Sequence, residues 1–323
     1  MQALLDIAPR GCRVRVGEPD NDCDSLSLCT AYAHEGYSSM NFDSARNAYF
    51  KDAIAACHAR RWLEVGVGAH ATLSRMVLDG APQRTLTGVE VLASSAKSAR
   101  RCLREYGKDR FHIVETSSYD MEGGPFDALL CEVVGAIASA EGIVDVVDDL
   151  CARGILTPLC HVIPTRVETF FAPVSLTARD LKRGGLYVTT RFASVKPASF
   201  DDTTPTRDRG LLEQYDLYTG TRTTAGLSAF TIHRECAVHG IGMYIVLDGA
   251  LSSCHGRDDA GKNWRMPVAL FDEVVNVRTG DVMNIASRVT SVARRHSYAF
   301  ECERGGDRWE VELKTEHMYA SFA

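Results

Sequence analysis

Between residues 61 and 131, short apolar runs alternate with segments of helical periodicity, and this alternation constrains the fold more than any other feature. The expected strands are residues 61–65, 85–91, 111–114 and 126–131, and the expected helices between them are residues 71–78 and 93–106. Strands that alternate with helices form a parallel sheet with right-handed crossovers, whose ligands bind at the carboxyl ends of the strands. The sequence therefore predicts a doubly wound, Rossmann-like α/β domain with a ligand site at that edge.

The chain extends beyond this domain on both sides. Apolar residues at three- and four-residue steps predict a helix over about 42–59, with Asp43 or Ser44 as its cap. From about residue 162, short β-rich runs separated by Gly, Asp and Pro predict an antiparallel β-barrel or sandwich. We expect an irregular and helical N-terminal segment over residues 1–60, the Rossmann-like domain over 61–162, and a barrel domain over 163–323 with a polar arm at about 193–215.

Charge and cysteine spacing exclude several classes of partner. The 323 residues carry a net charge of −6, whereas chains that bind nucleic acid normally carry a basic surplus. The eleven cysteines show no Cys-x-x-Cys pair and no zinc-type spacing, and their odd number favours reduced thiols in the cytoplasm. The first residues lack the features of a secretory signal, and no run reaches the roughly 18 apolar residues of a membrane span. We therefore expect no nucleic acid, no metal and no membrane association.

A Gly-x-Gly turn follows the first expected strand. Gly66 and Gly68 allow positive φ and a close approach of the backbone to a ligand, and the N–H groups of a helix N-terminus follow them. A dinucleotide-binding turn would place a third glycine where the chain has Ala71. Glu64 before the turn suits a cationic amino-acid cofactor, and Glu90 ends the second strand where a carboxylate commonly binds ribose hydroxyls. These residues favour S-adenosylmethionine over NAD.

Two carboxylates bracket the turn after the fourth expected strand. Glu132 follows the apolar residues of this strand directly, and Glu141 comes nine residues later, beyond Gly135. Carboxylate pairs most often act in general acid/base catalysis or bind a metal, but no third metal ligand accompanies this pair. Two facing carboxylates can also hold both edges of a planar guanidinium by bidentate hydrogen bonds and leave one nitrogen oriented toward an electrophile.

This carboxylate pair resembles the double-glutamate loop of the protein arginine N-methyltransferase family, a class I family that depends on S-adenosylmethionine. The resemblance covers the chain from about residue 28 to its C-terminus. Its further motifs are Tyr32-Ala33-His34 with Gly36, Met40 and Arg46 in the N-terminal segment, Glu64 to Gly68, Gly88-Val89-Glu90, Ile163-Pro164 at the start of the barrel, Asn263-Trp264, and Val277 to Asp281. The family fold is a Rossmann-like methyltransferase domain followed by an antiparallel β-barrel with a dimerisation arm.

The resemblance implies a role for each matching residue. Glu132 and Glu141 would hold the guanidinium of arginine, while the N-terminal segment would fold over S-adenosylmethionine, whose product is S-adenosylhomocysteine. The implied cofactor-binding residues are Tyr32, Met40, Arg46 (cofactor carboxylate), Glu64, Gly66 and Gly68 (amino-acid part), Glu90 (ribose), Val91, and Ser118 and Tyr119 (adenine). Asn263 and Trp264 would line the substrate pocket, and no metal or redox cofactor would be required.

The sequence departs from the family at three places. His70 replaces the third glycine of the first motif, and Leu28-Cys29 replaces a leading Tyr-Phe. Asn263 replaces a histidine that the family ties to substrate orientation and to the product formed, so the degree of methylation stays open.

Composition bears on the substrate. The Ala-, Arg-, Val- and Asp-rich sequence is typical of a GC-rich bacterium, and it resembles the bacterial relatives that methylate free L-arginine in nitrosourea antibiotic biosynthesis. We therefore expect an enzyme that acts on free L-arginine, and the family resemblance implies that it is a homodimer formed through the polar arm at about 193–215. The alternatives are an enzyme that acts on arginine in polypeptides, a non-catalytic methyltransferase-like partner subunit and, more weakly, an NAD-dependent oxidoreductase.

Overall fold

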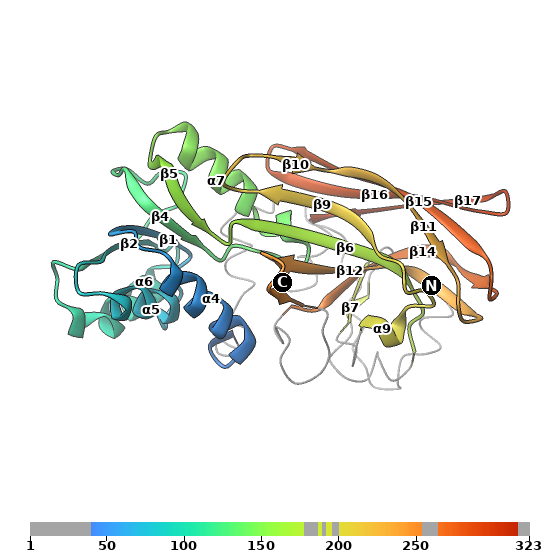
Figure 1. Cartoon of the computed structure of the whole chain (residues 1–323), viewed down its shortest axis with the longest axis horizontal. Helices are drawn as coiled ribbons and strands as arrows, with labels where there is room; N and C mark the ends of the chain where they lie inside the picture. The colour runs from blue at the N-terminus through green and yellow to red at the C-terminus, as the bar shows by residue number, and fades with distance from the viewer. Residues whose placement is uncertain (1–39, 178–186, 189–191, 196–199, 254–263, 316–323) are drawn as a thin grey trace.

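The first part of the described chain is an α/β unit with a parallel β-sheet, and the second part consists mainly of antiparallel strands (Figure 1). The computed structural model describes residues 40–177, 187–188, 192–195, 200–253 and 264–315. The elements of the first part are α4 (Ser44–Ala56), β1 (Arg61–Val65), α5 (Thr72–Gly80), β2 (Thr85–Val89), α6 (Ala93–Cys102), η1 (Arg104–Tyr106), β3 (Phe111–Val114), β4 (Phe126–Cys131), η2 (Ala138–Glu141), α7 (Ile143–Ala152) and β5 (Leu156–Ile163).

The strands of the parallel sheet lie in the order β3-β2-β1-β4-β5. Helices cover both of its faces: Trp62 and Leu130 pack with residues of α4, α5 and α6, whereas Leu63 and Leu129 pack with residues of α7. Because successive side chains of a strand point to opposite faces, burial on both faces requires the continuous apolar runs seen in the sequence. The expected strands 61–65, 111–114 and 126–131 are confirmed, and the expected strand 85–91 ends at Val89.

Helix α4 begins where the sequence predicts. The side chain of Asp43 accepts a hydrogen bond from Arg46 N at 3.1 Å, which caps the helix. Phe50 and Ile54 follow Arg46 at four-residue steps and are buried, because these positions share one face of a helix. This packing brings Arg46 toward the sheet.

All described strand pairs of the second part are antiparallel. Its elements are β6 (Arg166–Val174), β7 (Tyr187–Val188), β8 (Phe192–Val195), α9 (Phe200–Thr203), β9 (Gly210–Asp216), β10 (Arg222–Thr223), β11 (Ala225–Thr231), β12 (Cys236–Leu247), β13 (Leu251–Ser252), β14 (Met266–Val277), β15 (Val282–Val292), β16 (Arg295–Arg304) and β17 (Asp307–Lys314). Within the described residues, one sheet has the order β10-β9-β6-β12-β14-β8-β7, with β13 on β12, and a second has the order β11-β15-β16-β17.

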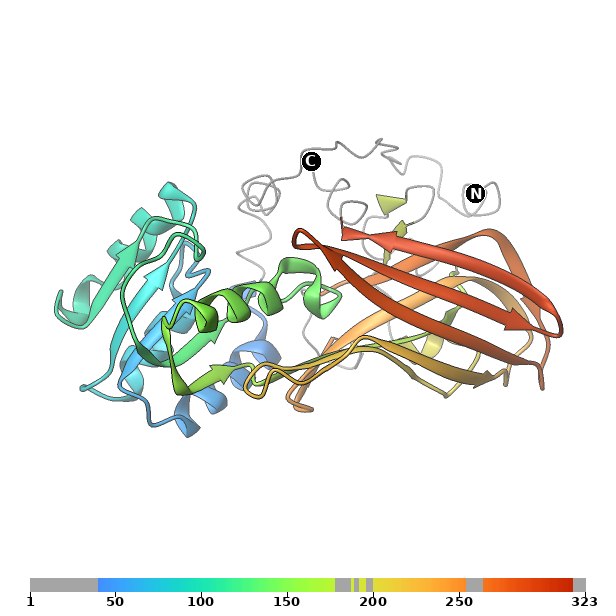
Figure 2. The same ribbon diagram turned by 90° about the horizontal axis from the view of Figure 1, so that it is seen from above.

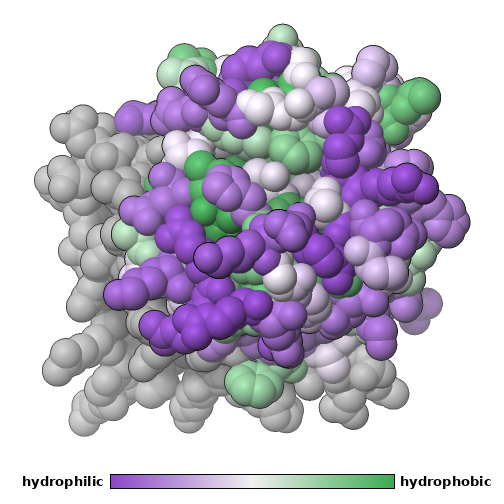
Figure 3. Space-filling view, turned by 90° about the vertical axis from the view of Figure 1, so that its left-hand side faces the viewer, coloured by the Kyte–Doolittle hydropathy of each residue, from purple (hydrophilic) through white to green (hydrophobic). Residues whose placement is uncertain are grey.

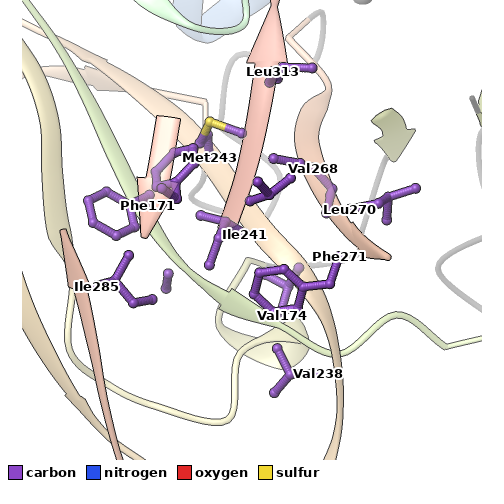
Figure 4. Packing of buried hydrophobic residues seen from close by; sticks show 14 of the residues in the cluster. Phe171, Val174, Val238, Ile241, Met243, Val268, Leu270, Phe271, Ile285 and Leu313 are labelled. Atoms are coloured by element: carbon purple, nitrogen blue, oxygen red, sulfur yellow. The ribbon is translucent and has the colours of Figure 1, made fainter. Parts of the chain in front are cut away.

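The two antiparallel sheets enclose one apolar core. Figure 2 shows β15, β16 and β17 lying across from the strands of the larger sheet. Phe171, Ile241 and Met243 of the larger sheet meet Ile285 and Leu313 of the smaller one (Figure 4), and all five are fully buried. This apolar interior makes the second part a barrel whose rim faces the parallel sheet.

Two expectations about this half need correction. Val162 and Ile163, expected among the barrel strands, belong to β5, the edge strand of the parallel sheet, since Ile163 pairs in parallel with Leu130. The segment 193–215, expected to project as an arm, contributes barrel strands at both ends, because residues 193–195 lie in β8 and residues 210–215 in β9. Apolar residues such as Ala193 and Leu212 are fully buried there, which holds those ends in the core.

The surface of the parallel-sheet end is mainly hydrophilic, with small apolar areas between polar side chains (Figure 3). Among the described residues, no helix is both long and apolar enough to cross a bilayer.

Candidate functional site

A depression lies at the carboxyl ends of β1 and β4, beside the N-terminus of α5. Its lining comes from three parts of the chain: the residues just before α4 with the first turn of α4, the end of β1 with the turn into α5, and the first residue after β4. The lining residues are Met40, Asn41, Arg46, Glu64, residues 66–73 and Glu132. This is the edge at which the alternating sequence predicts a ligand site.

The glycine turn forms the floor of the depression. Gly66 and Gly68 have φ values of 80° and 67°, in the left-handed region that favours glycine. The N–H groups of Gly66 and Val67 both donate to Val89 O, which holds the turn against the end of β2. Ala71 also lies in the left-handed region, with φ of 49°, immediately before the first turn of α5. The chain thus makes the strand-to-helix turn without a third glycine.

Glu90 ties the ends of β1 and β2 together. Its Oε2 accepts a hydrogen bond from Gly68 N at 2.8 Å, and its Oε1 accepts one from Leu92 N at 2.9 Å. Each carboxylate oxygen has a second lone pair, so Glu90 can still accept hydrogen bonds from hydroxyl groups. Val91, the next residue, is half-buried and does not line the depression.

Glu64 is a buried acid among other acids. Only 2% of it is exposed, and its carboxyl accepts a hydrogen bond from Ser74 Oγ. Its pKa is raised to about 8: burial is the largest cause, the nearby carboxylates of Glu132 and Glu90 act in the same direction, and Ser74 and Arg46 partly offset them. A cationic group in this depression would stabilise the ionised form of Glu64.

Arg46 and Glu132 form a buried ion pair across the depression. Arg46 Nε and Nη2 donate to Oε1 and Oε2 of Glu132, while Nη1 donates to Asn47 Oδ1 at 2.8 Å. Burial raises the pKa of Glu132, while the guanidinium of Arg46 lowers it. Both residues were predicted at the site but their pairing was not, and the helical spacing of Arg46 with Phe50 and Ile54 is the sequence signal that points to it.

The loop between Glu132 and Glu141 folds back on itself. A Cβ atom on Gly135 would lie 2.8 Å from Ile137 O and 3.2 Å from Glu141 N, so a side chain does not fit there without a shift of the backbone. Gly135 therefore packs against the turn η2, whose last residue is Glu141. Trp264 Nε1 donates to Val134 O at 3.0 Å, which places the predicted pocket residue against this loop.

The predicted adenine-binding residues lie apart from the depression lining. Ser118 is buried, and its carbonyl accepts a hydrogen bond from Arg153 Nη2 at 2.6 Å. The guanidinium carbon of Arg294, in the turn between β15 and β16, lies 3.5 Å from the centre of the Tyr119 ring. Burial raises the pKa of Tyr119 to about 12. No feature of the sequence pointed to this contact between the barrel and the parallel-sheet domain.

The structure therefore assembles most, but not all, of the predicted site. Met40, Arg46, Glu64, Gly66, Gly68 and Glu132 line one depression, with Glu90 bound to its floor and Trp264 bound to the adjoining loop. Tyr32 and Asn263 lie outside the described residues. Over the described ranges, no group of three or more His, Cys, Asp and Glu side chains is arranged to hold a metal ion.

Solved structures share the fold of this chain. A chain of the Trypanosoma brucei PRMT1 enzyme–prozyme heterotetrameric complex with AdoHcy is 16% identical, with a TM-score of 0.70 over 88% of this chain and 99% of that one. An open conformation of Arabidopsis thaliana protein arginine methyltransferase 10 is 13% identical, with a TM-score of 0.71 over 89% and 99%. The sequence matches no protein-family model and no curated protein. The likeness confirms the predicted fold class, a Rossmann-like domain followed by an antiparallel β-barrel.

Proposed function

We propose that this chain transfers a methyl group from S-adenosylmethionine to a guanidino nitrogen of arginine. One observation carries the proposal: the carboxylate of Glu132 binds a guanidinium, that of Arg46, through both oxygens, beside the glycine turn of a Rossmann-like sheet. Each oxygen keeps a second lone pair, so Glu132 can bind an incoming guanidinium while Arg46 fixes the plane of its carboxylate. The fold shared with protein arginine methyltransferases supports the same conclusion.

The residues of the depression fit S-adenosylmethionine. Glu64 is a buried carboxyl beside two other acids, and a cationic amino group next to it would relieve their repulsion. Within the described residues, Arg46 donates three of its five N–H groups, which leaves two for the cofactor's carboxylate. Glu90 would accept the ribose hydroxyls. Met40, Val91, Ser118 and Tyr119, together with Tyr32, complete the proposed cofactor site.

The reaction follows from how the loop carboxylates orient arginine. S-adenosylmethionine supplies an electrophilic methyl group on a sulfonium. Glu132 and Glu141 would accept the N–H groups of the substrate guanidinium, fix its plane and draw its positive charge toward one edge, so the remaining terminal nitrogen becomes more electron-rich. That nitrogen would form the new N–C bond as the C–S bond of the sulfonium breaks, S-adenosylhomocysteine would be the leaving group, and one proton of the nitrogen would pass to water. Positioning therefore supplies most of the acceleration, with Trp264 and Asn263 proposed to wall the substrate.

Free L-arginine is the favoured substrate, on the resemblance of the sequence to bacterial enzymes of nitrosourea biosynthesis. Arginine within polypeptides is the alternative substrate. A homodimer and a cytoplasmic location stay predictions of the sequence, which sedimentation and fractionation can test.

The test compares variants of the two proposed roles. Purified protein is incubated with S-adenosylmethionine and either L-arginine or an arginine-rich polypeptide, and the products are weighed by mass spectrometry. Glu132→Gln removes the charge that holds the guanidinium, so we expect kcat to fall at least about 100-fold while S-adenosylhomocysteine still binds. Glu310→Gln makes the same chemical change on exposed β17 and should leave kcat unchanged.

Each outcome has a separate meaning. Methyl on L-arginine supports the favoured substrate, and methyl on the polypeptide alone supports the alternative. Binding of S-adenosylhomocysteine without any methylation would contradict the proposed reaction. Failure to bind it at all would favour the non-catalytic partner subunit.

A further inference from the structure

We propose that Glu213, deep in the barrel, is a positioning residue for the catalytic loop: it holds the turn that carries Glu141 in register with Glu132. The inference rests on the proposed function for the roles of the two loop glutamates. Glu213 lies on β9, is fully buried, and has no part in the depression itself.

Three hydrogen bonds reach the carboxylate of Glu213 from the loop and from β6. Its Oε1 accepts from Ser139 N at 3.1 Å and from Thr169 Oγ1 at 2.8 Å, and its Oε2 accepts from Ser139 Oγ at 2.7 Å. Ser139 lies in the turn η2, two residues before Glu141. Both polar groups of Ser139 that can donate a hydrogen bond are therefore bound to one barrel carboxylate.

Further hydrogen bonds connect the loop to β6 and to a third barrel strand, β16. Thr169 Oγ1 accepts from Ala138 N at 2.9 Å, and Ser139 Oγ lies 3.0 Å from the hydroxyl of Tyr298 on β16. Burial and the charge of Glu213 raise the pKa of Tyr298, so this hydroxyl stays protonated over the physiological range. Two successive loop residues are thus bound to β6, β9 and β16 at once.

Packing alone does not require a carboxylate at this position. In the described part of the chain Glu213 has no ion pair with Lys, Arg or His, so its buried charge is compensated by neutral donors alone. Burying an ionised group costs free energy unless several hydrogen bonds compensate it. An apolar residue would fill the core at less cost, but it would leave Ser139 N–H without an acceptor.

The other end of the loop has its own anchor. Trp264 donates to Val134 O, and Gly135 packs on the backbone of Glu141. With Glu213 binding Ser139, the loop is fixed on both sides of Gly135, and the separation of the two carboxylates is fixed with it. A displacement of about 1 Å at a reacting group can cost about 100-fold in rate.

Three variants test this role in the full-length protein. Glu213→Ala leaves Ser139 N–H and Thr169 Oγ1 without their acceptor, and we expect kcat for arginine to fall about 10- to 100-fold, with an unchanged Kd for S-adenosylhomocysteine. Glu213→Gln should restore most of kcat, because its amide oxygen can accept from Ser139 N and Thr169 while its NH₂ donates to Ser139 Oγ. Glu168 is also buried, but it lies on β6 with its carboxylate in an ion pair with Arg166, so Glu168→Ala is the matched control and should keep the wild-type kcat.

A second readout does not depend on methyl transfer. Hydrogen exchange of the segment 132–141 should become faster in Glu213→Ala and stay at the wild-type rate in Glu168→Ala.

If Glu213→Ala fails to fold, a second variant tests the same contact. The isosteric Thr169→Val removes the hydrogen bond to Ala138 N, and it should lower kcat while the Kd for S-adenosylhomocysteine stays unchanged. Wild-type exchange in the loop, or wild-type kcat in folded Glu213→Ala, would overturn the inference. Inactive wild-type protein with accelerated loop exchange in the variant would instead refute the proposed function and leave the anchor intact.

Discussion

Replacing Glu64 with glutamine should stabilise the protein, and the gain should grow as the pH rises. Burial raises the pKa of this carboxyl from 4.5 to about 8, and it is 2% exposed. Between these values the carboxyl is protonated in the folded protein and ionised in the unfolded chain. The folded state therefore binds the extra proton, so the stability of the wild type is full below pH 4.5 and falls as the pH rises toward 8.

The size of the effect follows from the two pKa values. Their difference, about 3.5 pH units at 1.36 kcal/mol for each, corresponds to about 5 kcal/mol. Between about pH 5 and pH 8, the free energy of unfolding of the wild type should fall relative to Glu64→Gln by about 1.4 kcal/mol for each pH unit. The amide of the variant does not titrate, and its oxygen can still accept the hydrogen bond from Ser74 Oγ.

Urea unfolding of both proteins without cofactor, at several pH values between about 5 and 8, measures this difference. Taking the difference between the two proteins removes the contribution of groups that titrate alike in both. Glu310→Gln, on the exposed surface of β17, is the control and should follow the wild type at every pH. If the difference in the free energy of unfolding between the wild type and Glu64→Gln stays constant within about 1 kcal/mol over this pH range, Glu64 titrates as in the unfolded chain and the prediction is wrong.

Three further predictions concern the same site. At pH 7, binding of S-adenosylhomocysteine should release a proton from Glu64, because the cationic amino group of the ligand favours the ionised carboxylate. Calorimetry in two buffers of different ionisation enthalpy measures this proton release, and Glu64→Gln should abolish it. Glu90→Ala should weaken that binding at least about tenfold, since it removes a charged acceptor and frees Gly68 N; an unchanged Kd in titration calorimetry would contradict the ribose role. Gly135→Ala should lower kcat while the Kd for S-adenosylhomocysteine stays unchanged, because its Cβ would lie 2.8 Å from Ile137 O; a wild-type kcat would show that the loop tolerates the side chain.

The sequence predicted the parallel sheet because local signals there agree. Each buried strand is a short apolar run, and a glycine turn or helical periodicity bounds it. The helix over 42–59 was predicted for the same reason, since Asp43 caps it and apolar residues repeat along one face. Local pattern alone was therefore sufficient for β1, β3, β4 and α4.

Where two structures share one local pattern, the sequence was not sufficient. An apolar run such as Val162-Ile163 suits a buried parallel strand and a barrel strand equally, so these last two residues of β5 were assigned to the barrel. Asp272 and Glu273 interrupt the apolar pattern between residues 268–271 and 274–277, but β14 continues through both, and their side chains are exposed. A pair of polar residues after an apolar run can mean that the strand ends there, or that the strand continues from a buried into an exposed region.

Contacts of the site between residues far apart in the sequence could not be predicted from it. The ion pair of Arg46 with Glu132 joins residues 86 positions apart, and the bonds of Ser139 to Glu213 span 74 positions. Glu213 lies in the segment expected to form a polar arm, and no spacing rule connects it with the loop. Residue types at the ends of the parallel strands, in contrast, were predictable because the topology brings those ends to one edge.

Locating the transferred methyl group is the strongest test of methyl transfer to arginine. Purified protein would be incubated with S-adenosylmethionine labelled in its methyl group and with L-arginine, beside an arginine-rich polypeptide, and tandem mass spectrometry would locate the label. We predict labelled methyl on a guanidino nitrogen of arginine, lost in Glu132→Gln and kept in Glu310→Gln. Label on neither substrate, from protein that binds S-adenosylhomocysteine, would contradict it.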